Sequence, residues 1–418
     1  MGGPFLNDLT PAILANAIPT QWEPKIRMDS ARKAFWGKFV GKEGSDQPII
    51  ERMDFTNTPG SAVNIQITSQ LLQEGQTGDT TLEGNEETIT LGQISITPNT
   101  LRNAVAVNWR AKKQINFDII MAIGDLLSTW IARRTDEDLF SSIVNSAVGS
   151  QLYAGAATSI STLGPATTFG VQEIMRGKAA LQRQGALPIR TIVDGKQEID
   201  WYGVVISEID EYNLKLDSIW NTNQKDAGFR GDDNKIFTGC LGSYNGVYVY
   251  THTSVKYSGR YGSYLRPEAG LTVALTSGST TPISVGSNTN VNYTKFFPSS
   301  GTLLIDGEQI AYVGTSNTQL GTTSITRAQN GTTGAAHNVG ALITANNLGR
   351  AIFFGAEIAA RAWGMLPTRI TDVRDYGYEQ GIGIMAYYGQ SVIQNSAGTL
   401  TPNFVLMNTY SPNPNSLI

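Results

Sequence analysis

Few residues in this chain could form a conventional catalytic or metal site. The two histidines, His252 and His337, lie far apart in the sequence, and Cys240 is the single cysteine. The chain has no His-Glu-x-x-His, Cys-x-x-Cys, Gly-x-Ser-x-Gly or phosphate-loop motif. The apolar, glycine-rich surroundings of Cys240 predict a buried packing cysteine rather than a nucleophile. We therefore expect no catalytic residue, no metal site and no cofactor.

The remaining motifs with chemical potential are weak. Gly381 to Ala386 matches the dinucleotide-binding fingerprint loosely, but that loop must follow a strand and open a helix. Here Tyr387 and Tyr388 continue a strand-like run, so we interpret the match as chance. The carboxylate pairs Asp232-Asp233 and Glu86-Glu87 lie in polar turns, where solvation is the ordinary explanation. Common catalytic constellations are thus absent, which favours a structural role.

Composition is compatible with extensive protein contacts. The chain has 418 residues and a formal charge of −4, too balanced for strong, sequence-independent DNA binding. Charged residues make up 16%, below the roughly 25% of ordinary domains. A neutral polar surface is cheap to cover with a partner, although a β-rich protein with many turns fits this composition equally well. With no signal-peptide pattern and no membrane-spanning stretch, we expect cytosolic synthesis and assembly.

Apolar and polar residues alternate after residue 61, as in a half-buried strand. A second such run follows a polar, glycine-punctuated segment at 73–88, so we expect a long two-stranded ribbon with an irregular tip. An isolated ribbon is marginally stable and exposes its edges. It must therefore pack either on its own domain or on another molecule. Its apolar residues are Val63, Ile65, Ile67, Ile89, Leu91, Ile94 and Ile96.

Residues 116–148 form the longest helical candidate, with helically spaced apolar residues that include Ile123, Leu127 and Trp130. The charged run after Ala132 places Arg133 four residues before Glu137 and Arg134 four before Asp138. These pairs predict i, i+4 ion pairs on a solvated or interfacial face. Residues 1–55, rich in proline and aromatic residues, read as an arm that lies on another part of the fold or on a neighbour.

Later elements alternate between helix and strand, which indicates a mixed α+β protein. A helix is expected at 171–184, stopped by Gly185 and Pro188, and a capping box at Ser207-x-x-Asp210. Strands are expected at 203–206, 247–250, 351–354, 382–388 and 404–406. Residues 270–345 are nearly uncharged and carry short β runs, which predicts an inserted β module on the surface of its host domain.

Several motifs, in order, resemble the major capsid proteins of the N-four-type family of tailed phages. They are Gly78-Asp79-Thr80-Thr81-Leu82-Glu83-Gly84-Asn85-Glu86-Glu87, Leu101-Arg102-Asn103-Ala104-Val105, Ala132 to Phe140, Ile236 to Val247, Ala362-Trp363-Gly364 and Asp375-Tyr376-Gly377. The resemblance covers about 50–270 and 346–410. It implies a Hong Kong 97-like capsid fold, whereas the N-terminal arm and the 270–345 insertion depart from the family pattern.

On that fold we expect an arm at 1–55, an extended β-hairpin loop at 56–110 and a peripheral domain with a spine helix at 111–168. The axial domain would span 169–269 and 346–390, with the β module at 270–345 inserted and a C-terminal strand and tail at 391–418. The ribbon residues would form intersubunit contacts. The expected loop tip is Asp79, Leu82, Glu83, Asn85, Glu86 and Glu87, and the expected spine-helix set is Ile123, Leu127, Trp130, Arg133, Arg134, Glu137 and Asp138.

The resemblance implies a major capsid protein that is not an enzyme. Copies would form hexamers and pentamers in an icosahedral head shell around double-stranded DNA, assembled in the host cytoplasm. Portal, scaffolding or decoration proteins would be its other partners, with weak non-specific DNA contact and no membrane. The alternatives are another self-assembling virion or nanocompartment shell protein and, from a different class, a β-rich polysaccharide hydrolase. A hydrolase would need two carboxylates about 5–10 Å apart in a cleft.

Overall fold

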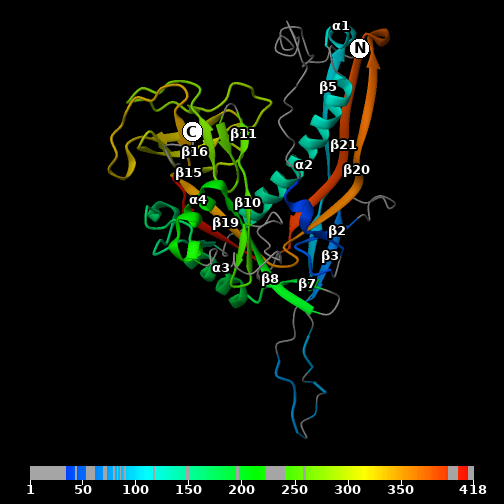
Figure 1. Cartoon of the computed structure of the whole chain (residues 1–418), viewed down its shortest axis with the longest axis vertical. Coiled ribbons are helices and arrows are strands. Elements are labelled where there is room, and N and C mark those ends of the chain that lie inside the picture. Colours follow the sequence, from blue (N-terminus) through cyan, green and yellow to red (C-terminus); the bar gives the residue numbers. More distant parts are fainter. Residues whose placement is uncertain are drawn as a thin grey trace. The chain divides into compact units, whose positions relative to one another are not determined.

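A computed structural model describes most of the chain (Figure 1). The described residues are 34–42, 45–52, 62–68, 73–78, 81, 83–84, 86–88, 91–115, 118–146, 151–193, 197–222, 241–257, 260–393 and 403–412. They belong to two compact units. Unit 1 comprises residues 1–142 and 357–401, and unit 2 comprises 143–356 and 402–418. The predicted mixed α+β class is confirmed.

Unit 1 is built on a five-stranded sheet in the order β1-β2-β20-β21-β5. Its strands are β1 (Val40–Gly41), β2 (Ile49–Arg52), β20 (Ala359–Arg374), β21 (Glu379–Val392) and β5 (Asn99–Asn108). The last two segments of this sheet in sequence, β20 and β21, form a long antiparallel hairpin closed by η6 (Asp375–Gly377). Strand β5 pairs with β21 along its whole length. The Gly381 to Ala386 segment therefore lies inside a strand, which excludes a dinucleotide-binding loop.

Helix α2 (Ile119–Ser146) is the long helix that the sequence predicts at 116–148. Its first turns pack Ile119, Ile123 and Leu127 against β5 and Ile382 of β21. Further along, Ile131 packs with Trp363, Ala386 and Tyr388. The short helix α1 (Trp109–Gln114) precedes it and is capped by the Asn108 side chain, which accepts a hydrogen bond from Ala111 N at 2.7 Å.

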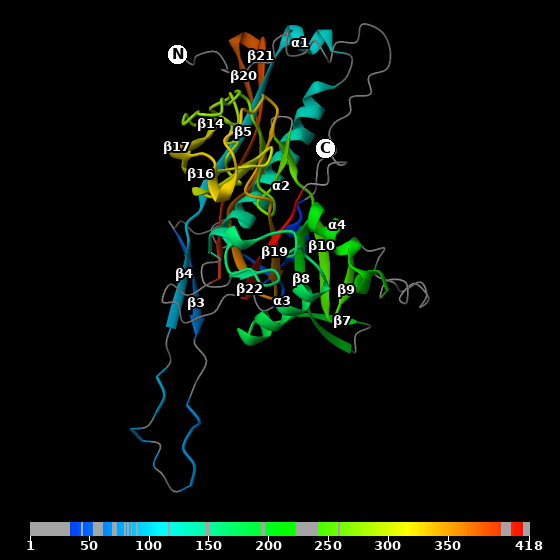
Figure 2. The same cartoon turned by 90° about the vertical axis from the view of Figure 1, so that its left-hand side faces the viewer.

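The predicted ribbon is present as β3 (Val63–Thr68) and β4 (Leu91–Ile96), paired in antiparallel register from Val63 opposite Ile96 to Thr68 opposite Leu91. The apolar residues at alternate positions share one face, as the period of two requires. Figures 1 and 2 show the described residues between Gln73 and Thr88 continuing away from the paired strands. The ribbon and its tip thus match the expected hairpin.

The central sheet of unit 2 runs β6-β22-β19-β8-β10-β9, with β7 on β8. Its strands are β6 (Gln151–Tyr153), β22 (Phe404–Tyr410), β19 (Leu348–Phe354), β8 (Gln197–Ser207), β10 (Val247–His252), β9 (Gly242–Tyr244) and β7 (Ile189–Val193). Helices α3 (Val171–Arg183) and α4 (Glu208–Leu216) accompany it, and a small β11 (Val255–Tyr257) and β12 (Arg260–Gly262) pair follows. All five predicted strand segments lie within β8, β10, β19, β21 and β22.

The helix boundaries in unit 2 follow local chemistry. Helix α3 ends before Gly185, whose φ of 72° is the left-handed conformation that glycine supplies after a helix. Ala186 N then bonds Leu181 O at 3.0 Å, closing a Schellman turn. Ser207 caps α4, with its hydroxyl accepting from Asp210 N at 3.2 Å. Both sequence-based boundaries are confirmed.

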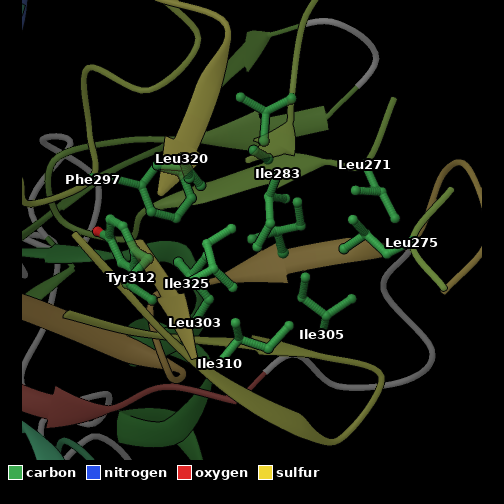
Figure 3. Packing of buried hydrophobic residues seen from close by; sticks show 14 of the residues in the cluster. Leu271, Leu275, Ile283, Phe297, Leu303, Ile305, Ile310, Tyr312, Leu320 and Ile325 are labelled. Carbon is green, nitrogen blue, oxygen red and sulfur yellow. The ribbon is translucent and has the colours of Figure 1, made fainter. Parts of the chain in front are cut away.

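Residues 268–344 form a six-stranded sheet of their own, in the order β13-β18-β15-β16-β17-β14. The strands are β13 (Glu268–Gly270), β14 (Ile283–Ser284), β15 (Ser300–Ile305), β16 (Glu308–Thr315), β17 (Gln319–Thr326) and β18 (Leu342–Thr344). Figure 3 shows Leu303, Ile310 and Tyr312 from this sheet gathered in one apolar cluster. Leu163 and Leu348 complete the cluster from outside the module.

These units correct the expected domain boundaries. Residues 357–390 were assigned to the axial domain, yet β20 and β21 pair with β2 and β5 in unit 1. Residues 143–168 were assigned to the peripheral domain, yet β6 pairs with β22 in unit 2. Strand β22, placed in a separate C-terminal segment, is a central strand of the unit 2 sheet. The expected boundaries group segments that are close in sequence, whereas these strands pair with partners far along the chain.

Candidate functional site

The base of the ribbon belongs to the core of its own chain. Val63, Ile65 and Ile96 are buried in a cluster with Ile50 of β2 and with Ala360 and Ala362 of β20. Ile94 is also buried, with 5% of its surface exposed. The prediction that these four side chains are covered by a second subunit is therefore wrong. The alternation of apolar residues correctly predicted that these side chains are buried, but it could not predict whether their own chain or a neighbouring copy covers them.

The other predicted ribbon residues are not placed in a contact. The side chains of Ile67 and Leu91 are not among those described, although both residues lie in paired strands. Ile89 lies outside the described residues. Their predicted intersubunit role stays a prediction.

The tip of the ribbon is strongly acidic. Residues 73–88 contain five carboxylates, Glu74, Asp79, Glu83, Glu86 and Glu87, and no lysine or arginine. Glu83 and Glu86 are exposed, and Glu87 is half-buried because Gln73 N donates to its Oε2 at 3.0 Å across the hairpin. Asp79, Leu82 and Asn85 lie outside the described residues. An exposed acidic tip is suited to a basic partner surface.

A basic and apolar surface lies on the same unit, at α1 and the end of the β20–β21 hairpin. Arg110, Lys112 and Lys113 of α1 are exposed, and Trp109, from which Lys113 Nζ lies 5.8 Å, is 55% exposed. The exposed large apolar residues nearby in sequence are Met121, Leu126, Leu366, Ile370, Val373, Tyr376 and Tyr378. So many exposed apolar side chains on α1, on the first turns of α2 and on the β20–β21 hairpin indicate interaction surfaces.

The outer edge of β20 is a second candidate interaction surface. Strand β2 pairs with β20 only from Ala359 to Ala362, so among the described strands the outer edge of β20 from Gly364 to Val373 has no strand partner. Unpaired strand edges offer backbone donors and acceptors to another chain. Pro367 interrupts the donors of this edge and limits regular pairing there.

The predicted ion pairs of the spine helix are confirmed. Arg133 Nε lies 3.6 Å from Glu137 Oε1, and Arg134 Nη2 lies 2.9 Å from Asp138 Oδ1. The prediction that this whole charged run is a solvated or interfacial face is only half right. Both arginines are partly exposed, whereas Asp136 and Glu137 are buried inside unit 1.

Asp136 binds the segment that enters the fold from the N-terminal arm. Its carboxylate accepts hydrogen bonds from Phe35 N and, at 3.2 Å, from Trp36 N. The rings of Trp36 and Phe140 pack 5.3 Å apart beside this contact. Trp36 is fully buried, so this part of the expected arm lies on its own chain. The sequence gives no sign of this contact because its two halves lie a hundred residues apart.

Burial dominates the electrostatics around Asp136. It raises the pKa of the carboxyl to about 6, although the hydrogen bonds from Phe35 and Trp36 and the charge of Arg361 act in the opposite direction. Burial also lowers the pKa of Arg361, which lies 5.9 Å from the Trp363 ring. Tyr388 donates a hydrogen bond to Asp138, and burial raises the pKa of this phenol. This buried charged cluster fastens α2 to the sheet.

A second charged network, also absent from the sequence-based expectations, lies in the β module. The Glu308 carboxylate accepts hydrogen bonds from Nε and Nη2 of Arg327, at 2.7 and 2.6 Å, and from the Ala335 backbone N–H at 2.9 Å. His337 bridges Glu308 and Asp306 at 2.9 and 3.0 Å. Although burial acts to raise it, these hydrogen bonds hold the pKa of Glu308 at about 2. The network connects three turns of the module.

Among the described residues, no group of three His, Cys, Asp or Glu side chains is arranged so that it could hold a metal ion, and none of the described helices is long and apolar enough to span a membrane. Cys240 and the Asp232-Asp233 pair lie outside them.

Comparison with known proteins bears on what these surfaces contact. Residues 12–160 match the model of a family described as phage capsid protein. This match covers less than half of the chain, and the similarity to phage capsids extends further only at the level of the fold. No curated sequence matches the chain.

The fold of this chain is similar to that of several solved phage capsids. The capsid of Ralstonia phage GP4 gives a TM-score of 0.63 at 17% identity over 95% of this chain and 96% of that one. The cyanophage Pam1 capsid gives 0.62 at 12% identity over 94% and 97%. The acid-stable capsid of Helicobacter pylori bacteriophage KHP30 gives 0.60 at 15% identity over 98% and 100%. At these identities the similarity shows a common fold, in agreement with the capsid-like fold expected from the sequence.

Proposed function

We propose that this chain is a phage capsid protein, and that it self-assembles into hexamers and pentamers that close an icosahedral head shell around packaged double-stranded DNA. The observation that carries the proposal is the coincidence of the capsid fold with surfaces that a single copy leaves open. These are the acidic ribbon tip, the unpaired edge of β20 and the exposed apolar end of its hairpin. A portal and scaffolding or decoration proteins would be its other partners, and assembly would take place in the host cytoplasm.

Within this shell, the acidic tip at 73–88 of one copy would contact α1 of a neighbouring copy. Charge complementarity supports this pairing, since the tip has carboxylates without cations and α1 has three exposed cations without carboxylates. The base of the ribbon, held by Val63, Ile65 and Ile96 in its own core, would act as a rigid support that presents the tip. Because the base of the ribbon packs within its own chain, the contact between copies would involve only the tip.

A charge-swap experiment tests this contact. Glu83→Lys with Glu86→Lys reverses the tip, and Lys112→Glu with Lys113→Glu reverses α1. Each pair alone should reduce the assembled fraction in sedimentation at least tenfold, because like charges then oppose each other at every repeated contact. All four changes together should restore closed shells in electron micrographs.

The matched control is Asp200→Lys, which reverses an exposed acidic residue of unit 2. It should assemble as the native protein does. If the two reversed pairs assemble normally, or if the fourfold variant gains nothing over either pair, the tip does not contact α1. Shells that form in all variants would leave the capsid function intact and remove only this contact.

A further inference from the structure

Unit 2 contains a cavity of about 580 Å³ that the shell function does not use. Its walls come from the end of α2, the β module near Phe296, and β19. The floor is buried and includes Asn346, Leu348 and Arg350, whereas Asn145, Ser161 and Ser300 on the rim are exposed. A cavity of this size with a buried floor and an open rim matches the dimensions of small-molecule sites.

Arg350 on the floor is a buried cation without a counter-charge. It is 5% exposed, and its Nη1 donates to Tyr264 O at 3.0 Å. Its Nε is buried with no hydrogen-bond partner among the described residues, and no carboxylate there forms an ion pair with it. Burial lowers the pKa of Arg350 to about 10, so the side chain remains charged at neutral pH. An uncompensated buried charge is costly to maintain.

Two other arginines among the described residues of unit 2 are paired with carboxylates. Arg266 Nη1 lies 3.0 Å from Glu268 Oε1, and Arg327 Nη2 lies 2.6 Å from Glu308 Oε2. Arg350 differs from these two arginines because no carboxylate of the described residues forms an ion pair with it. The missing partner is an anion, and the cavity is the space in which an anion could meet the guanidinium.

The other residues that line the cavity also favour an anion. Lys295 and Arg350 are its charged residues, and no Asp or Glu lines the cavity. The Tyr264 and Phe296 rings form an edge-to-face pair at 5.1 Å, and Lys295 Nζ lies 4.9 Å from the Phe296 ring centre. Aromatic walls next to two cations suit a ligand with one anionic group on a flat or apolar body.

We propose that this cavity is a binding site for a small organic anion, whose carboxylate or phosphate pairs with Arg350 and Lys295 while its body lies against Tyr264 and Phe296. Every residue that lines the cavity belongs to unit 2 of one copy, so a single copy forms the whole site. A phosphate would engage both cations more strongly, and a carboxylate would match the guanidinium in a two-point contact.

Ligand-observed NMR and calorimetry on the full-length, unassembled chain can test the proposal with three probes of one shape. Benzoate presents a carboxylate, phenyl phosphate presents a phosphate, and benzamide is the neutral analogue. At least one anion should bind ten times more tightly than benzamide, and the tighter of the two assigns the anionic group. Lys295→Glu should weaken that anion at least tenfold, whereas the matched variant Lys113→Glu, which changes a lysine beside a tryptophan in unit 1, should not.

A second variant guards against a folding defect. Ser300→Trp places a large ring at the exposed rim without touching the buried floor, and it should abolish binding while leaving the thermal unfolding temperature unchanged. Equal binding of both anions and benzamide would overturn the proposal. Unchanged anion affinity in Lys295→Glu and Ser300→Trp would overturn it as well.

Discussion

At the residue scale, the buried carboxyl of Asp136 gives the protein a pH response. Its pKa is raised from 3.8 to about 6 by burial, so ionisation is disfavoured in the folded state. The free energy of unfolding that this group contributes is then fully present below about pH 4 and is lost as the pH rises through about 6. A shift of this size corresponds to a loss on the order of 3 kcal/mol.

Asp136→Asn should remove this response. Chemical unfolding of the unassembled chain at about pH 4 and about pH 7.5 measures it, and the native-minus-variant difference isolates Asp136 from Asp210, whose pKa burial also raises to about 6. The side-chain amide of the variant keeps one acceptor oxygen for the Phe35 and Trp36 N–H groups, so the variant should still fold. An identical pH dependence in both proteins would show that the buried carboxyl does not titrate in this range.

Glu308 should behave in the opposite direction. Its pKa is held at about 2, so its contribution to stability is present above about pH 4.5 and is lost as the pH falls towards 2. Glu308→Gln leaves Arg327 buried without its carboxylate and should cost about 3–5 kcal/mol in unfolding free energy. Asp306→Asn, on a side chain that is 56% exposed, should cost less than about 1 kcal/mol. Equal costs in calorimetry would contradict the assignment of Glu308 as the centre of the network.

At the element scale, the contact of α3 with the sheet depends on a glycine. Replacing Gly by Ala inside a helix normally stabilises it by about 1 kcal/mol. At Gly177, a Cβ atom would lie 2.5 Å from the Phe353 ring of β19, so Gly177→Ala should instead destabilise unit 2 by about 1–3 kcal/mol. Phe353→Leu in the same chain should recover part of that loss. A stabilising Gly177→Ala in urea unfolding would show that α3 does not pack this closely.

The ribbon offers a contrast between its base and its tip. Ile65→Asp introduces a charge into the core shared with β2 and β20 and should lower the unfolding free energy of the unassembled chain by several kcal/mol. Glu86→Lys at the exposed tip should leave that free energy within about 0.5 kcal/mol of the native value. A stable Ile65→Asp chain that fails only in assembly would return the ribbon base to the subunit interface.

Elements with strong local periodicity could be predicted from the sequence, and their partners could not. The α2 helix and the β3–β4 pair follow from apolar spacing, and the ends of α3 and α4 follow from Gly185 and Ser207. The placement of β20 and β21 in unit 1 depends on pairing with residues near 50 and 100, which no local pattern encodes. The same limit hid the contact of Asp136 with Phe35 and the Glu308 network.

At the scale of the whole molecule, attraction between the tip and α1 would make assembly sensitive to salt. Exposed charges are screened beyond about 8 Å at physiological ionic strength and beyond about 3 Å at 1 M. Assembly of the native chain, followed by light scattering, should therefore slow at least tenfold between about 0.05 and 0.5 M salt. The fourfold charge-swapped variant should show the same dependence. A rate that is independent of salt would indicate that apolar contacts alone drive assembly.

The central claim is that this chain covers its open surfaces with copies of itself. A cryo-electron microscopy reconstruction of the assembled protein tests it most directly. The account predicts a closed shell of hexamers and pentamers in which residues 73–88 of one copy lie against α1 of another. A protein that stays a single copy at high concentration, with this loop folded onto its own chain, would contradict it.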